Sequence, residues 1–171
     1  MEYTIFNTDM GWVAVLASQK GLVGISLPRS TVEEALGEIG RGVKEAANSP
    51  ARFEDLSSRM RAYFAGKKVS FADKLDLSTA TPFQQKVWQA ARRIAYGETR
   101  SYGWLAQSSG KPGAARAVGQ AMAKNRLLIV VPCHRVTGGR GIGGFSGGIY
   151  LKKRLLRLEA SVPSSIGQSA E

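Results

Sequence analysis

The sequence predicts an α+β protein in which a small antiparallel sheet with helices precedes a mainly helical domain. Three short apolar segments separated by turn residues open the chain, whereas helical spacing dominates after residue 80. The charge pattern changes at about the same place, because basic residues dominate from Lys86 onward. We therefore expect an N-terminal mixed α/β domain over residues 1–78, a C-terminal domain over 79–160 and a disordered polar tail over 161–171.

In the first domain, glycine-containing turns separate three expected strands at residues 3–7, 12–17 and 22–27. Ser30 and Thr31 each precede a glutamate by three residues, so two overlapping capping boxes predict a helix that runs to about Ala47. A second helix is expected over residues 53–65, followed by Gly66 as a left-handed cap, and residues 73–78 indicate a strand or linker.

In the second domain, Thr81-Pro82-Phe83-Gln84 combines three helix-start signals, and apolar spacing continues that helix to about Ile94. Helices over 101–108 and 113–124 are joined by a short glycine-containing turn, the pattern of a helix-turn-helix or of an ordinary helical hairpin. The basic surroundings favour the helix-turn-helix. A strand over 127–131, a glycine-rich loop over 137–148 and a helix over 151–160 complete the domain.

Charge and composition narrow the function classes. The chain carries 24 Lys and Arg against 13 Asp and Glu, a net charge of +11, which favours a nucleic-acid partner over a merely solvated basic surface. Apolar runs fall short of a membrane span, and the N-terminus lacks a signal-peptide pattern, so we expect no membrane association and a cytoplasmic location. One cysteine and one histidine cannot build a usual zinc site, so no metal is expected.

That single cysteine and single histidine are adjacent, at Cys133 and His134, between an apolar run and the glycine-rich loop. A thiol reacts as its thiolate, so a working cysteine needs a base or a positive charge nearby. His134 and Arg135 are candidates for these roles, and we expect the pKa of Cys133 to lie below the ~8.5 of a free cysteine. A protease-like pair is disfavoured, because adjacent residues in an extended segment face opposite ways.

Several ordered motifs carry a family resemblance: Pro132-Cys133-His134-Arg135-Val136, the preceding Ser101-Tyr102 and Ala114-Ala115-Arg116-Ala117-Val118-Gly119, and the following Gly144-Phe145-Ser146-Gly147-Gly148. From about Thr81 to Glu159 the chain resembles the methylated-DNA protein-cysteine S-methyltransferases, also called 6-O-alkylguanine-DNA alkyltransferases. The first domain matches this family only in outline, which implies a small ribonuclease H-like domain.

The resemblance implies direct-reversal DNA repair. Cys133 would take a methyl or other alkyl group from the 6-oxygen of guanine in one irreversible turnover without a cofactor. Whether the 4-oxygen of thymine is a second donor is left open by the sequence. His134 would deprotonate the thiol through a water, Glu159 would orient His134, and Asn125 would hold the two site segments together.

The same resemblance assigns the substrate pocket and the DNA contacts. Tyr102 would hydrogen-bond the flipped base, Ser146 the guanine oxygen, and the backbone of Cys133 and Val136 the exocyclic amine. Arg116 would replace the extruded base in the stack of double-stranded DNA bound through the minor groove. Small residues of that helix permit close approach to the backbone, and further contacts are expected from Ala115, Gly119, Lys124 and Lys152. We expect a monomer without an obligate protein partner.

The chain departs from the family's sequence pattern at two places, and two alternative functions remain beside direct repair. Arg126-Leu127-Leu128 replaces a proline-containing segment common in the family, and Phe145 stands where tyrosine is common. An alkyltransferase-like protein that binds lesions without transfer is the first alternative, although such proteins replace the reactive cysteine. A helix-turn-helix transcription factor is the second, and it would leave Cys133, His134 and Glu159 without a joint purpose.

Overall fold

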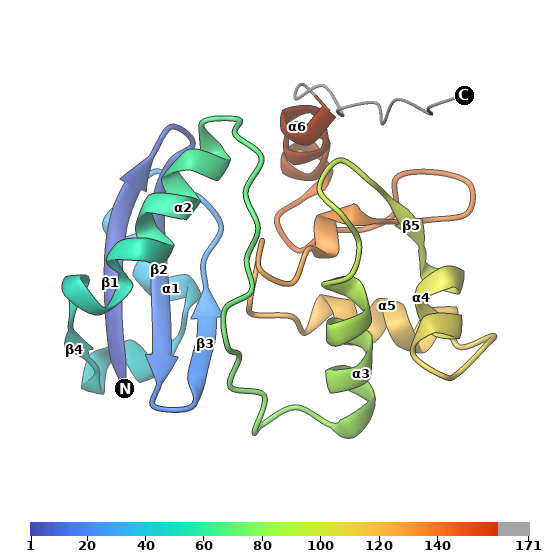
Figure 1. Cartoon of the computed structure of the whole chain (residues 1–171), viewed down its shortest axis with the longest axis horizontal. Helices are drawn as coiled ribbons and strands as arrows, with labels where there is room; N and C mark the ends of the chain where they lie inside the picture. The colour runs from blue at the N-terminus through green and yellow to red at the C-terminus, as the bar shows by residue number, and fades with distance from the viewer. Residues whose placement is uncertain (161–171) are drawn as a thin grey trace, which may run out of the picture.

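The structure, a computed structural model, describes residues 1–160, so the expected polar tail at 161–171 lies outside the described residues. A small sheet flanked by helices lies beside a group of helices, and an extended segment connects them (Figure 1). The α+β prediction is confirmed. Within residues 1–160, no helix is both long enough and apolar enough to cross a bilayer.

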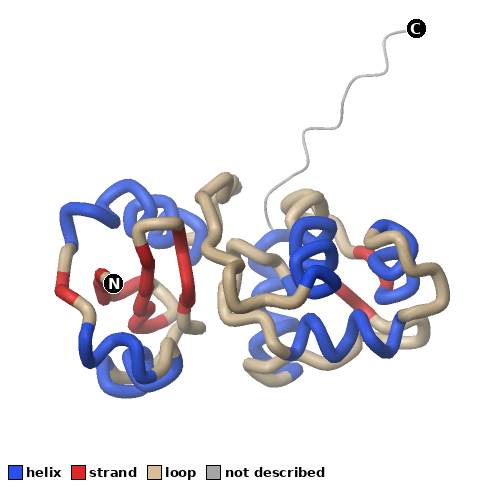
Figure 2. Tube along the Cα trace, turned by 90° about the horizontal axis from the view of Figure 1, so that it is seen from below, coloured by secondary structure: helices blue, strands red, loops and turns tan. Residues whose placement is uncertain are grey.

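The N-terminal sheet has the strand order β3-β2-β1-β4. The three expected strands form as an antiparallel meander, with bounds β1 Glu2–Thr8, β2 Gly11–Ser18 and β3 Gly21–Ile25. A two-residue strand that the sequence did not predict, β4 Ala47–Asn48, adds to β1 in parallel and makes the sheet mixed. Helices lie on both sides of this sheet (Figure 2).

The first helix is shorter than predicted. Thr31 and Glu34 form the expected capping box at the start of α1 Val32–Glu38, whereas the overlapping box from Ser30 does not form, because the Glu34 carboxylate accepts from both backbone N–H groups. The predicted continuation to Ala47 is wrong. Gly40 adopts a φ of +91°, which ends the helical path, and a 3-10 turn then returns the chain to pair with β1.

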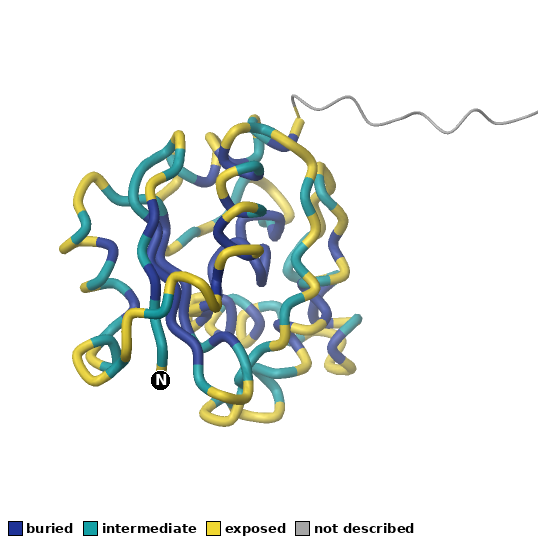
Figure 3. Tube along the Cα trace, turned by 60° about the vertical axis from the view of Figure 1, so that its left-hand side comes forward, coloured by how far each residue is buried: buried dark blue, intermediate teal, exposed yellow. Residues whose placement is uncertain are grey.

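The second helix forms nearly as expected and covers one face of the sheet. It spans α2 Glu54–Phe64, and Gly66 follows it at a φ of +89°. Its inner face buries Leu56, Met60, Tyr63 and Phe64 within the larger of two hydrophobic clusters. Each such side chain contributes about 1.5–3 kcal/mol through burial. The buried segments of the sheet and of the neighbouring helix lie together in the interior (Figure 3).

Four helices build the second part of the molecule. Their bounds are α3 Pro82–Ala91, α4 Tyr102–Ser108, α5 Ala115–Ala123 and α6 Ile149–Ala160. The Thr81–Gln84 capping box forms, but α3 ends before Ile94, which is buried in the turn that follows. The Trp88 indole donates to the Ala121 carbonyl at 3.0 Å and so joins α3 to α5.

The predicted strand at 127–131 is wrong. Ile129 has a φ of +70°, and the Val131 N–H donates to the Leu127 carbonyl, so this buried segment reverses direction. Only Leu127 forms a bridge with β3, beside a hydrogen bond from Ile25 N to Arg126 O of 2.8 Å. The reversal leads directly into a 3-10 turn at Cys133–Arg135, and β6 Val136–Thr137 then pairs with β5 Arg100–Ser101.

Candidate active site

Cys133 lies at a cavity of about 270 Å³ between α4, α5 and the glycine-rich loop. Three predicted site residues, Tyr102, Gly119 and Ser146, line this cavity together with the cysteine. The cysteine is 7% exposed. The complete lining is Tyr102, Gly119, Met122, Ala123, Cys133, Gly144, Phe145 and Ser146. The structure therefore brings residues that lie up to 44 positions apart in the sequence together around one thiol.

The Asn125 side-chain amide donates a hydrogen bond to the Cys133 sulfur at 3.4 Å. The same amide donates to the Val131 carbonyl, and its oxygen accepts the Leu127 N–H at 2.9 Å. Burial raises the pKa of the Cys133 thiol, and hydrogen bonds from Asn125 and from the backbone of Cys133 and His134 oppose that increase only in part. The expectation of a lowered thiol pKa is therefore wrong for this structure, and the thiol needs a base when it reacts.

The buried pair of His134 and Glu159 contains a candidate for that base. The Nε2 atom of His134 lies 2.7 Å from Oε1 of Glu159, and both side chains are almost fully buried. Burial lowers the pKa of His134, so the imidazole is neutral at pH 7. Burial also acts to raise the pKa of Glu159, but donors from His134 and Arg135 outweigh it and lower that pKa to about 2. An ionised Glu159 accepts a hydrogen bond from the Nε2–H group of the neutral imidazole. The Nδ1 atom then carries no proton and has a free lone pair.

The Nδ1 atom of His134 is buried and has no hydrogen-bond partner in the part of the chain that the structure describes. Among side chains, Asn125 and not His134 donates a hydrogen bond to the sulfur. The side chains of Cys133 and His134 share no hydrogen bond, as expected for neighbouring residues, even though Cys133–Arg135 is a 3-10 turn.

Three further residues hold Glu159, none of them expected from the sequence in this role, and one is Gly97, whose backbone N–H donates to Oε2 at 3.1 Å. Arg135 donates to both carboxylate oxygens at 2.9–3.1 Å and to the Ile94 carbonyl at 2.8 Å. The Tyr63 hydroxyl, from α2 of the N-terminal part, donates to Glu159 Oε1 at 2.7 Å. Arg135 could have been found from its place beside the cysteine, whereas Tyr63 is 71 residues from His134 and no local signal indicates it.

Other predicted substrate contacts occupy different positions. Tyr102 is half-buried, with its hydroxyl 3.4 Å from the Gly144 carbonyl, and burial together with the nearby Cys133 raises its pKa. Ser146 is exposed at the mouth of the cavity. Val136 is buried and does not line the cavity, and its carbonyl accepts from Lys152 at 2.5 Å.

The position of Lys152 differs from the DNA contact expected of it. Its side chain is fully buried, and its ammonium donates to the Val136 and Gly144 carbonyls. A buried ammonium cannot reach a phosphate, so the prediction of a backbone contact is wrong. Lys152 instead ties the glycine-rich loop to the segment that follows Cys133, and burial lowers its pKa to about 8.

The remaining expected DNA contacts lie on or next to α5. Arg116 and Lys124 are exposed, whereas Ala115 and Gly119 are partly exposed. A side chain at Gly119 would meet nothing within 4 Å, so the surface above the cavity is open at this point. The helix that carries the exposed cation Arg116 therefore also lines the cavity, through Gly119 and Met122.

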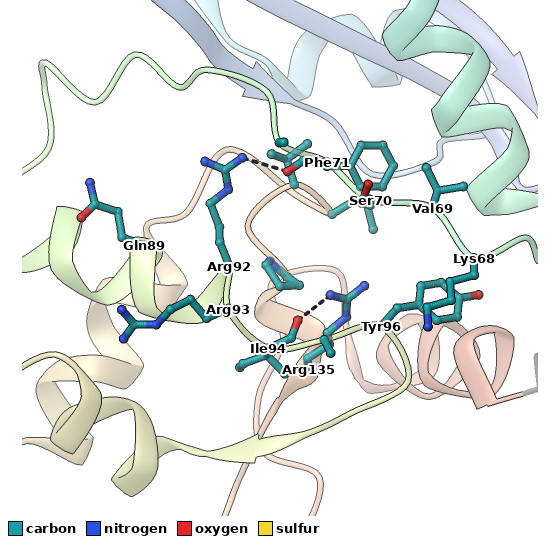
Figure 4. Close-up of a pocket in the computed structure, with 15 residues that line it drawn as sticks. Lys68, Val69, Ser70, Phe71, Gln89, Arg92, Arg93, Ile94, Tyr96 and Arg135 are labelled. Atoms are coloured by element: carbon teal, nitrogen blue, oxygen red, sulfur yellow. Dashed lines mark hydrogen bonds between the residues drawn. The ribbon is translucent and has the colours of Figure 1, made fainter. Parts of the chain in front are cut away.

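A larger cavity, of about 760 Å³, lies elsewhere, between the connecting segment and the residues that follow α3. In this cavity Arg92 reaches the Phe71 carbonyl and Arg135 reaches the Ile94 carbonyl (Figure 4). Its lining contains neither the cysteine nor the histidine. The smaller cavity is therefore the candidate active site.

Two family models together match most of the chain. The 6-O-methylguanine DNA methyltransferase ribonuclease-like domain matches residues 1–77, and the DNA-binding domain of the same name matches residues 82–161. A methylated-DNA–protein-cysteine methyltransferase of Mycolicibacterium paratuberculosis is 49% identical over 93% of this chain and 92% of its own. The namesake of Mycobacterium leprae is 54% identical over 63% of this chain, a match that spans 65% of the relative.

Solved structures agree with this result over nearly the whole chain. The O6-methylguanine methyltransferase of Mycobacterium tuberculosis has a TM-score of 0.79 at 38% identity, covering 96% of this chain and 95% of its own. A structure of Mycobacterium tuberculosis OGT in complex with DNA has the same score and identity, with 94% of each chain covered.

Proposed function

Because the chain belongs to the 6-O-methylguanine DNA methyltransferase family, we propose that it repairs alkylated DNA by direct transfer of the alkyl group to Cys133. One observation carries this proposal. The sole thiol lines a cavity together with Tyr102 and Ser146, and the residue that follows it, His134, forms a buried pair with Glu159.

In the proposed step, the Cys133 sulfur attacks the alkyl carbon attached to the 6-oxygen of guanine. The sulfur–carbon bond forms as the carbon–oxygen bond breaks, and that electron pair stays with guanine, whose anion then takes up one proton in place of the one that the thiol loses. The thiol proton passes through a water to Nδ1 of His134, whose Nε2 proton is held by ionised Glu159. Tyr102 keeps its own proton at neutral pH, because its pKa is raised, and donates a hydrogen bond to the leaving base.

The transfer ends with a thioether on Cys133. The carbon–sulfur bond of a thioether persists under physiological conditions, because a thiolate is a poor leaving group from an alkyl carbon, and the chain has no second cysteine to accept the alkyl group. Each molecule therefore acts once.

The base has to leave the helix to reach this thiol. Cys133 is buried at a cavity of about 270 Å³, which suits one nucleobase and not an intact base pair. Arg116 lies exposed on the same helix as the cavity-lining Gly119 and is the candidate to fill the vacated stack. Docking of this helix in the minor groove suits a repair protein that ignores sequence. In this proposal the protein acts on DNA as a monomer in the cytoplasm.

The alkyltransferase-like alternative fits less well, because Cys133 is present and lies in the cavity. The proposal is tested by mixing protein with an excess of duplex that carries one 6-O-methylguanine. The lesion should disappear until one equivalent per chain is consumed and then persist. Continued turnover would overturn the single-use mechanism, and an intact lesion would overturn the transfer. A parallel duplex with 4-O-methylthymine defines the range of substrates.

A further inference from the structure

We propose that Tyr63 is a positioning residue for the His134–Glu159 pair, so that the N-terminal part of the molecule contributes directly to activation of the thiol. The inference rests on the proposed function and adds a residue from outside the matched DNA-binding domain. Tyr63 belongs to α2, whereas His134 and Glu159 belong to the second half of the chain.

The geometry places the Tyr63 hydroxyl against both members of the pair. It donates to Oε1 of Glu159 at 2.7 Å, and its oxygen lies 3.2 Å from Nε2 of His134. The same carboxylate oxygen is 2.7 Å from Nε2. Because the Tyr63 hydroxyl donates its hydrogen bond to Glu159, and ionised Glu159 can only accept, the proton between His134 and Glu159 has to reside on Nε2. The tyrosine thus favours the tautomer in which Nδ1 is free to act as the base.

The hydroxyl keeps this role at every working pH. Burial raises the pKa of Tyr63 well above its ordinary value, and the charge of Glu159 adds to that effect. The ring is fully buried and makes edge contacts with Phe64, Phe71 and Tyr96. Its position is therefore fixed by the packing of the N-terminal part and the connecting segment, and the hydroxyl has no freedom to turn toward solvent.

Tyr96 provides a matched control. Its ring lies 6.0 Å from the ring of Tyr63, and its hydroxyl is also buried, but that hydroxyl has no hydrogen-bond partner among the described residues. Tyr63→Phe and Tyr96→Phe remove the same atom from neighbouring sites. Only the first change removes a donor from Glu159.

The test measures single-turnover methyl transfer from a saturating 6-O-methylguanine duplex between pH 5 and 9. Tyr63→Phe should slow transfer about tenfold, the effect of one hydrogen bond to a charged group. It should also move the acidic limb of the profile to higher pH. With one donor fewer, Glu159 attracts the imidazolium more strongly, so His134 becomes the neutral base only at higher pH. DNA affinity should stay unchanged, and Tyr96→Phe should keep the wild-type rate and profile.

Two outcomes overturn the inference: a Tyr63→Phe profile that coincides with that of Tyr96→Phe, or a slower rate with an unmoved acidic limb. If Tyr63→Phe fails to fold, 3-fluorotyrosine placed at position 63 keeps the ring and makes a stronger donor. The limb should then move to lower pH, and an unmoved limb again overturns the role. Wild-type transfer is measured first. Its absence refutes the proposed function, whereas normal wild-type transfer with coincident profiles refutes only the role of Tyr63.

Discussion

Asn125 offers a sharp test of how the buried thiol is made reactive. Its amide donates to the Cys133 sulfur at 3.4 Å and to the Val131 carbonyl at 3.1 Å, and its oxygen accepts the Leu127 N–H. A hydrogen bond to a charged group is worth about 1.5–3 kcal/mol, which corresponds to roughly one to two pKa units. Asn125→Ala should therefore raise the pKa of Cys133 by that amount and slow transfer about tenfold to a hundredfold near neutral pH.

A second variant separates this electrostatic effect from damage to the fold. Asn125→Ala also leaves the buried Leu127 N–H without a partner, at a cost of about 1–3 kcal/mol in the free energy of unfolding. Asn125→Asp keeps an oxygen for that N–H but places a carboxylate beside the sulfur. It should slow transfer more than Asn125→Ala does and raise the thiol pKa further.

The assay is the single-turnover transfer rate as a function of pH, with urea unfolding measured in parallel for each variant. Loss of stability without a change in the pH dependence of transfer would show that Asn125 only holds the chain reversal together. Equal thiol pKa values in wild type, Asn125→Ala and Asn125→Asp would refute the reasoning.

Three further predictions concern charged residues. Arg116→Ala should slow repair of an intact duplex far more than repair of the free base, where nothing is unstacked, and equal losses in the two rate assays would assign Arg116 to the fold or the pocket. Lys124→Ala should flatten the salt dependence of duplex binding by about one unit, whereas buried Lys152→Met should leave that slope unchanged and lower the free energy of unfolding by about 1–3 kcal/mol. Glu159 should titrate near pH 2 by carbon-13 NMR. Because the pKa of Glu159 in the folded protein lies below the ordinary 4.5, ionised Glu159 contributes up to about 3 kcal/mol to the free energy of unfolding above pH 4.5. This contribution is lost as the pH falls toward 2. Titration of Glu159 near pH 4.5 would contradict the described contacts.

The parts of the fold that could be predicted from sequence are those specified by local signals. The three strands of the meander follow from alternating apolar segments and turns, and the capping boxes at Thr31 and Thr81 locate two helix starts. The failures have nonlocal causes. The apolar segment at 127–131 has the composition of a strand, but its burial between the two parts of the molecule stabilises a chain reversal with Ile129 at positive φ.

In the candidate site, too, residues marked by local sequence motifs could be predicted, whereas residues whose role depends on tertiary packing could not. The cysteine motif and the family resemblance identified Cys133, Tyr102, Gly119 and Ser146, which the structure brings to one cavity. Lys152 looked like a surface cation, because charge in a sequence gives no measure of burial. Tyr63 could not be found, since its role depends on the packing of α2 against residues 71 and 96 positions further along the chain.

The mass of the intact protein tests the central claim most directly. After incubation with a 6-O-methylguanine duplex, wild-type protein should gain the mass of one methyl group, and fragmentation should locate that group on Cys133. Cys133→Ser should bind the same duplex and gain no mass. A methyl group on any other residue, or a mass gain by Cys133→Ser, would contradict the assignment of Cys133 as the acceptor.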